Sequence, residues 1–75
     1  MDAKFHDDYK KLGLNIAYYR KGKGLSQIKL AELADISRTH MSRIENSDCA
    51  VSLDAIFNIA SVLGVPVNKL FEFRD

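Results

Sequence analysis

Residues 27–46, which read QIKLAELADISRTHMSRIEN, decide how this chain folds. Two short helical patterns occur in this stretch, one over Gln27 to Ala34 and one over Arg38 to Glu45. With successive side chains about 100° apart around a helix, Met41 and Ile44 fall on one side of the second pattern, and hydrogen-bonding or cationic side chains fall on the other. The stretch therefore predicts two short helices joined by a turn, the second with one buried and one exposed face.

The residues around the turn favour a close crossing of the two helices. Asp35 lies where the backbone is expected near the left-handed region, which Asp tolerates better than most residues. Ile36 is expected to enter the core from this turn, and Ser37 to cap the second helix through its hydroxyl group. Ala31 indicates a crossing that leaves room for no more than a methyl group. The expected apolar set of the first helix is Leu30, Ala31, Leu33 and Ala34. These features predict a helix-turn-helix.

An amphipathic helix is expected before this motif, from Asp8 to Lys21. Its apolar residues are Leu12, Ile16 and Tyr19, at spacings of four and three. Asp7 or Asp8 is expected to cap its first turn, and residues 1–7 to be frayed. Residues 22–24, Gly-Lys-Gly, predict a loop that lacks the preceding strand and the Gly-Lys-Ser/Thr ending of a phosphate-binding loop. Ser26 is then placed to cap the next helix.

Two further helices are expected after a loop over residues 46–51. Ser52 caps a fourth helix that Gly64 ends, and Pro66 begins a short fifth helix. The expected apolar face of the fourth helix is Leu53, Ile56, Phe57, Ala60 and Leu63. Val67, Leu70 and Phe71 are expected to face inward from the fifth. The chain thus predicts an all-α, compact five-helix fold that makes one domain over residues 1–75.

Composition limits the classes of protein to which the chain can belong. Hydrophobic residues make up 47% of its 75 residues and charged residues 28%, with one proline, which favours an ordinary soluble globule over a disordered chain. No apolar run approaches the roughly 20 residues that span a bilayer, and the amino terminus lacks a signal-peptide core, so we expect a cytoplasmic protein. His6, His40 and the single Cys49 form no pattern typical of a catalytic or metal site. We expect no enzyme, metal or cofactor.

The net charge of +1 is unevenly distributed along the chain. Residues 20–43 sum to +4 and residues 9–19 to +2, whereas residues 1–8 sum to −2 and residues 44–75 to −3. The positive segment contains the predicted helix-turn-helix, as expected of a protein that meets a phosphate backbone. A solvated basic face would carry the same charges, so charge alone leaves both interpretations open.

From Leu12 to Phe71 the chain resembles the phage-repressor type of helix-turn-helix protein, the Cro-like or XRE family. The buried positions of the motif carry this resemblance, together with Leu12-Gly13, Gly24-Leu25-Ser26-Gln27 and residues 60–65, ASVLGV. Asp35 departs from the family, which usually has glycine there. The resemblance implies a lambda-repressor-like domain that binds double-stranded DNA through its second and third helices. It also implies a structural ion pair between Arg20 and Glu45.

The resemblance and the helical geometry together give the candidate DNA contacts. The candidates for reading base edges are Arg38, Thr39, Ser42 and Arg43, and those for contacting phosphates are Ser26, Gln27, Ser37, His40 and Asn46. For Ser37 a capping role is equally favoured, and for His40 a partly packed flank position is favoured over a phosphate contact. The run Ser37-Arg38-Thr39, with Ser42 and Ile44-Glu45, is similar to that of restriction-modification controller proteins, which are small dimers.

One short recognition helix reads only a few base pairs, so we expect a homodimer on a pseudo-palindromic operator. The expected dimer face comprises Val67, Leu70, Phe71 and Phe73, with a core position favoured for Phe71. The alternative is a protein-interaction module that keeps the fold, such as the antitoxin partner of a toxin. The sequence does not indicate the operator, the regulated genes, or whether binding activates or represses.

Overall fold

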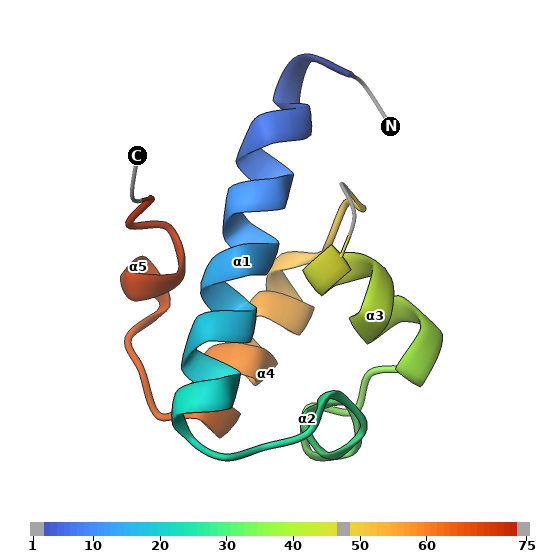
Figure 1. Cartoon of the computed structure of the whole chain (residues 1–75), viewed down its shortest axis with the longest axis vertical. Coiled ribbons are helices and arrows are strands. Elements are labelled where there is room, and N and C mark those ends of the chain that lie inside the picture. The colour runs from blue at the N-terminus through green and yellow to red at the C-terminus, as the bar shows by residue number, and fades with distance from the viewer. Residues whose placement is uncertain (1–2, 47–48, 74–75) are drawn as a thin grey trace.

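The computed structural model describes residues 3–46 and 49–73, and helices are the only regular elements in these two ranges. A 3-10 helix, η1 (Ala3–Phe5), precedes α1 (His6–Gly22), α2 (Gln27–Leu33), α3 (Arg38–Asn46), α4 (Leu53–Leu63) and α5 (Val67–Leu70). In Figure 1, α1 runs through the middle of the molecule, with α2 and α3 on one side of it and α5 on the other. The prediction of an all-α fold with five helices and a helix-turn-helix at α2 and α3 is confirmed.

Helix α1 is longer at both ends than predicted. It begins at His6 directly after η1, so residues 3–7 of the segment that we expect to fray are helical, and residues 1–2 lie outside the described residues. Phe5 occupies the N-cap position, and no side chain caps the helix; Asp7 and Asp8 lie in its first turn, where their negative charge suits the helix dipole. At its other end Gly22 is still helical, and the chain turns at Gly24, whose φ is +75°.

The three predicted serine caps and the predicted turn are confirmed, whereas the predicted cap of α1 by Asp7 or Asp8 is not. Each cap is a serine whose Oγ accepts a backbone N–H three residues later: Ser26 from Lys29 (3.0 Å), Ser37 from His40 (3.0 Å) and Ser52 from Ala55 (3.1 Å). Asp35 has a φ of +57°, in the left-handed region. From the same turn the N–H of Ile36 donates to the carbonyl of Ala31 at 2.9 Å, and the Ile36 side chain packs against the core.

The core is a single cluster to which every α-helix contributes. Its buried members are Leu12, Ile16, Leu30, Ala31, Ala34, Met41, Ile44, Ile56, Ile59, Ala60, Leu63 and Leu70. The expectation that Leu33, Leu53 and Phe57 face inward is wrong, since all three are exposed. On α4 the buried face runs through Ile56, Ile59 and Leu63, and at about 100° per residue Leu53 and Phe57 fall on its edge. The apolar surface of α4 is wider than the part that the other helices cover.

Gly13 lets α1 approach the carboxyl-terminal end of α3. A Cβ atom at this position would collide with the carbonyl oxygen of Ile44 and would lie 3.1 Å from the carbonyl oxygen and 3.2 Å from the Cα of Glu45. These are backbone atoms, so a rotamer change cannot relieve the clash. The α1–α3 packing therefore requires glycine at position 13.

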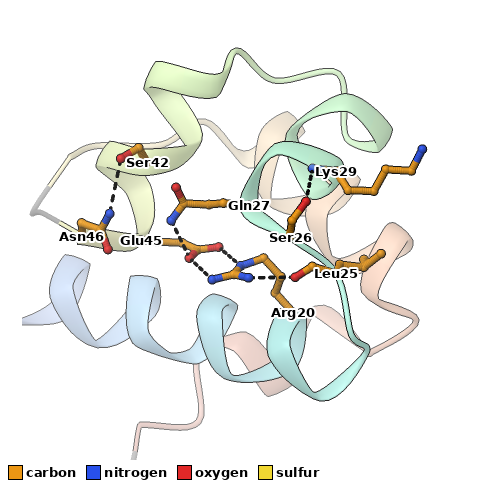
Figure 2. Close-up of polar contacts among 8 residues, drawn as sticks. All are labelled: Arg20, Leu25, Ser26, Gln27, Lys29, Ser42, Glu45 and Asn46. Atoms are coloured by element: carbon orange, nitrogen blue, oxygen red, sulfur yellow. Dashed lines mark hydrogen bonds and ion pairs between the residues drawn. The ribbon is translucent and has the colours of Figure 1, made fainter.

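The predicted ion pair joins the same two helices. Arg20 donates to both carboxylate oxygens of Glu45, from Nε to Oε2 at 2.8 Å and from Nη2 to Oε1 at 3.0 Å, and its Nη1 donates to the carbonyl of Leu25 at 2.8 Å (Figure 2). The side chain of Glu45 is 1% exposed and that of Arg20 is 11% exposed. Because water cannot replace these contacts, each charge depends on the other for its stability.

Asn15, which the sequence did not single out, anchors the carboxyl-terminal segment to α1. Its side chain is buried, and Nδ2 donates to the carbonyl oxygens of Leu70 (2.9 Å) and Glu72 (3.2 Å). These bonds satisfy carbonyls at the end of α5 that the short helix leaves without helical partners. The orientation of α5 is thus tied to the middle of α1.

The expected dimer face needs one correction here. Leu70 is 0% exposed and belongs to the core, so its side chain is not available to a second copy. Phe71 is 46% exposed, which contradicts the preference for a core position. Val67 and Phe73 are half-buried and pack against the core, and the rings of Phe71 and Phe73 lie 6.5 Å apart.

Gly13→Ala should destabilise the domain, whereas Gly22→Ala in the same helix should not. The clash with the α3 backbone is expected to lower the free energy of unfolding by about 1–3 kcal/mol. Gly22 has nothing within 4 Å of its added Cβ and a helical backbone, so alanine there should raise stability by about 0.5–1 kcal/mol. Urea unfolding of both variants checks this. If Gly13→Ala and Gly22→Ala were equally stable, the close approach of the α1 and α3 backbones would not be required for folding.

Glu45→Lys should remove about 3–5 kcal/mol of stability, because it places a second cation beside Arg20 in a buried site. The matched control is Glu32→Lys, since Glu32 is exposed and its contact with Lys29 spans 4.0 Å. That change should cost less than about 1 kcal/mol. If Glu45→Lys had the same melting temperature as the parent, the Arg20–Glu45 pair would have no structural role.

Candidate nucleic-acid interface

The exposed sides of α2 and α3 enclose an open hollow of about 650 Å³. It is lined by Gln27, Ile28, Arg38, Thr39, Ser42 and Arg43. All four residues predicted to read bases therefore lie on one surface. Arg38, Thr39 and Arg43 are exposed and Ser42 is half-buried, whereas Met41, Ile44 and Glu45 of the same helix are buried. One side of the short helix α3 thus packs against the core, and the other side is exposed to solvent.

Hydrogen-bond donors dominate the chemistry of this hollow. Arg38 and Arg43 each carry five N–H donors in a planar fork and no acceptor, a geometry that matches paired acceptors such as N7 and O6 of guanine. Thr39 and Ser42 add hydroxyl groups, and Thr39 also offers a methyl group. This set suits the edges of bases and a phosphate backbone better than it suits a small apolar ligand.

Gln27 is fixed in orientation by Glu45. Its Nε2 donates to Glu45 Oε1 at 2.9 Å, an oxygen of the carboxylate that already accepts hydrogen bonds from Arg20 (Figure 2). An ionised carboxylate only accepts hydrogen bonds, so the amide nitrogen must face it and the amide oxygen must point away, as Figure 2 shows. Gln27 therefore keeps its oxygen and one N–H for a ligand. The sequence predicted the ion pair but not this third member.

The other predicted phosphate contacts surround the hollow, and several are already hydrogen-bonded. The Oγ atoms of Ser26 and Ser37 accept the capping bonds described above, and each hydroxyl keeps its own proton to donate. Asn46 is exposed and donates from Nδ2 to Ser42 Oγ at 3.3 Å, one turn back on α3. His40 is half-buried, as expected of a flank position.

Ile28 was missed by the sequence analysis. It lines the hollow, is 45% exposed, and stands beside Gln27 in the first turn of α2, whose buried residues are Leu30 and Ala31. At about 100° per residue, position 28 falls on a different side of α2 from Leu30 and Ala31, so the helical period could have indicated that Ile28 is exposed. An isolated apolar residue among polar ones is common on protein surfaces, so the pattern alone did not single it out.

Neither a metal site nor a membrane-spanning helix is found in residues 3–46 and 49–73. No group of three or more His, Cys, Asp or Glu side chains there could hold a metal ion. No helix within these ranges is long and apolar enough to cross a membrane.

Comparison with known proteins gives the same picture. The family model described as helix-turn-helix, HTH_3, matches residues 16–70. The control protein C.SmaI of Serratia marcescens is 33% identical over 69 residues, which cover 92% of this chain and 82% of that protein.

Two solved structures are similar over most of the chain. The restriction-modification controller protein C.AhdI from Aeromonas hydrophila has a TM-score of 0.84 and 33% identity, covering 88% of this chain and 100% of that one. SinR, a master regulator for biofilm formation, has been solved in complex with DNA. Its TM-score is 0.77 and its identity 34%, and the match covers 81% of this chain and 98% of the SinR chain. The match to the family model over most of the chain, the relatives and the position of α3 agree: this chain belongs to the helix-turn-helix family HTH_3 and is a transcriptional regulator, not an enzyme.

Proposed function

We propose that the chain binds double-stranded DNA as a homodimer and lays one α3 helix in the major groove of each half of a pseudo-palindromic operator. The observation that carries this proposal is the hollow between α2 and α3, where Arg38, Thr39, Ser42 and Arg43 face outward from a helix anchored by its opposite side. The structure of SinR, which is 34% identical, contains DNA and supports DNA binding by a chain of this fold.

In this proposal the two arginines supply sequence recognition. Arg38 and Arg43 each donate two hydrogen bonds to a guanine, and Thr39 packs its methyl group against a thymine, with Ser42 as a further base contact. Ser26, Gln27, Ser37, His40 and Asn46 contact phosphates and set the position of α3 in the groove.

We further propose that the regulated genes belong to a restriction-modification system. C.SmaI is named a control protein, and C.AhdI is named a restriction-modification controller; both are 33% identical to this chain over most of its length. The alternative of an antitoxin has no observation in its favour among the described residues or these relatives.

The dimer face that we propose is built from Val67, Phe71 and Phe73, without Leu70. Exposed Phe71 borders an apolar cleft of about 420 Å³, whose other walls include Phe5 and Tyr9. An exposed aromatic ring beside an apolar cleft is the kind of surface that a second copy covers. In Figure 1, α5 and α3 lie on opposite sides of α1, so contact through this face leaves α3 accessible.

Arg43→Ala should weaken binding to an operator selected from random duplex DNA by about 5- to 150-fold and relax the preference at one base pair. The control is Lys29→Ala, which removes another exposed cation and should weaken binding to all sequences alike. Fluorescence anisotropy at two salt concentrations measures both effects, and melting confirms that each variant is folded. If Arg43→Ala kept the full base preference of the parent, this residue would not read the operator.

Phe71→Ser should shift the protein from dimer to monomer and lower its operator affinity, because a polar side chain replaces an aromatic ring at the proposed interface. Leu33→Ser is the matched control, since Leu33 is 51% exposed but lies on α2. It should leave the dimer intact. Sedimentation velocity at micromolar concentration gives the answer, and a Phe71→Ser variant that sediments as the parent does would remove Phe71 from the interface.

A further inference from the structure

The hollow contains one large apolar side chain for which the fold has no use. Ile28 is 45% exposed, and the other residues that line the hollow are polar or cationic. The buried face of α2 is formed by Leu30 and Ala31, with Ala34 just beyond the helix, so the core does not need Ile28. In the free protein this side chain is exposed in the hollow, on the α2 side, and shares the hollow with Arg38 and Arg43 of α3.

The first turn of α2, which carries Ile28, is linked to α3 by one hydrogen bond and is capped by another. The preceding neighbour of Ile28, Gln27, donates to Glu45 near the end of α3 at 2.9 Å. The following neighbour, Lys29, has its N–H bound by Ser26 at 3.0 Å. The first turn of α2 is therefore tied to α3, whose Thr39 lines the same hollow and carries a methyl group. Two apolar groups thus share one fixed, otherwise polar surface.

A DNA duplex offers a matching group in its major groove. The apolar feature that a base pair displays there is the C5 methyl group of thymine, whereas the remaining groups are hydrogen-bond donors and acceptors. The donors of Arg38 and Arg43 suit guanine acceptors, and a methyl group on a neighbouring pyrimidine would meet Ile28 and Thr39.

We propose that Ile28, together with Thr39, forms a socket for the C5 methyl group of one pyrimidine in each half-site, which makes Ile28 a determinant of operator specificity. This inference rests on the proposed binding of operator DNA. The same methyl group occurs on 5-methylcytosine at the same ring position, so the socket recognises a 5-methylpyrimidine, and thymine and 5-methylcytosine are its two sources.

Substitution of uracil for thymine tests the socket, because it removes the methyl group and keeps every hydrogen bond of the base. Each thymine of the selected operator is replaced in turn, and binding is measured with the parent, Ile28→Ala and Ile28→Val. The parent should lose about 3- to 10-fold in affinity at one position per half-site. Ile28→Ala, which leaves Thr39 as the remaining wall of the socket, should lose most of the difference between the thymine and uracil forms at that position. Ile28→Val should retain more of it.

A second arm separates the two sources of the methyl group. At the sensitive position the pair is changed to one containing cytosine or 5-methylcytosine. The methyl group should raise the affinity of the parent much more than that of Ile28→Ala. If 5-methylcytosine restores the affinity of thymine, the socket accepts either source; if it restores only part, the hydrogen-bonding groups of the base also select thymine.

The outcomes that overturn the inference are distinct from those that overturn DNA binding. Equal binding of thymine and uracil operators at every position, or a loss with uracil that persists unchanged in Ile28→Ala, would exclude the Ile28 socket and leave the proposed function intact. Failure to enrich any sequence from random duplex DNA would overturn the proposed function and this inference with it. Ile28→Ala should melt at the same temperature as the parent, because the side chain is exposed and makes no part of the core.

Discussion

The fold depends on the contact between α1 and the carboxyl-terminal end of α3. Gly13 allows the two backbones to approach there, and the carboxylate of Glu45 accepts hydrogen bonds from Arg20 on α1 and from Gln27 on α2. Three helices are thereby joined at one nearly water-free point. A clash or an unpaired charge at this point has no neighbouring solvent to relieve it, which is why single substitutions here are expected to have large effects.

The same contact prepares the surface that we propose faces DNA. Because α3 is held by Met41, Ile44 and Glu45, its opposite side presents Arg38, Thr39 and Arg43 without any rearrangement. Gln27 extends the network to the first turn of α2 and so sets the spacing across the hollow. Recognition residues held in place before binding lose less conformational entropy when the complex forms. Stability and recognition are therefore served by two sides of one short helix.

Local features were predictable from the sequence, whereas features that depend on what covers a surface were not. The serine caps, the left-handed Asp35 and the Arg20–Glu45 pair follow from residue types that have few alternative roles, or from the family resemblance. The exposure of Leu33, Leu53, Phe57 and Phe71 depends on how much of each helix is covered by its neighbours, and the spacing of apolar residues does not encode this coverage. Asn15 and Ile28 escaped notice because a single polar residue in an apolar stripe, or the reverse, has meaning only once its neighbours in space are known.

The central claim is that the α1–α3 contact holds a preformed DNA-reading surface. Amide chemical shifts of the protein, recorded by NMR with and without the selected operator duplex, test it most directly. The account predicts large shift changes at residues 26–28 and 37–46, with the amides of Gly13, Ile16 and the rest of the α1 core face nearly unchanged. Changes centred on α1 around Gly13, or spread evenly through the core, would show that α3 must move relative to α1 to bind DNA and would contradict the claim.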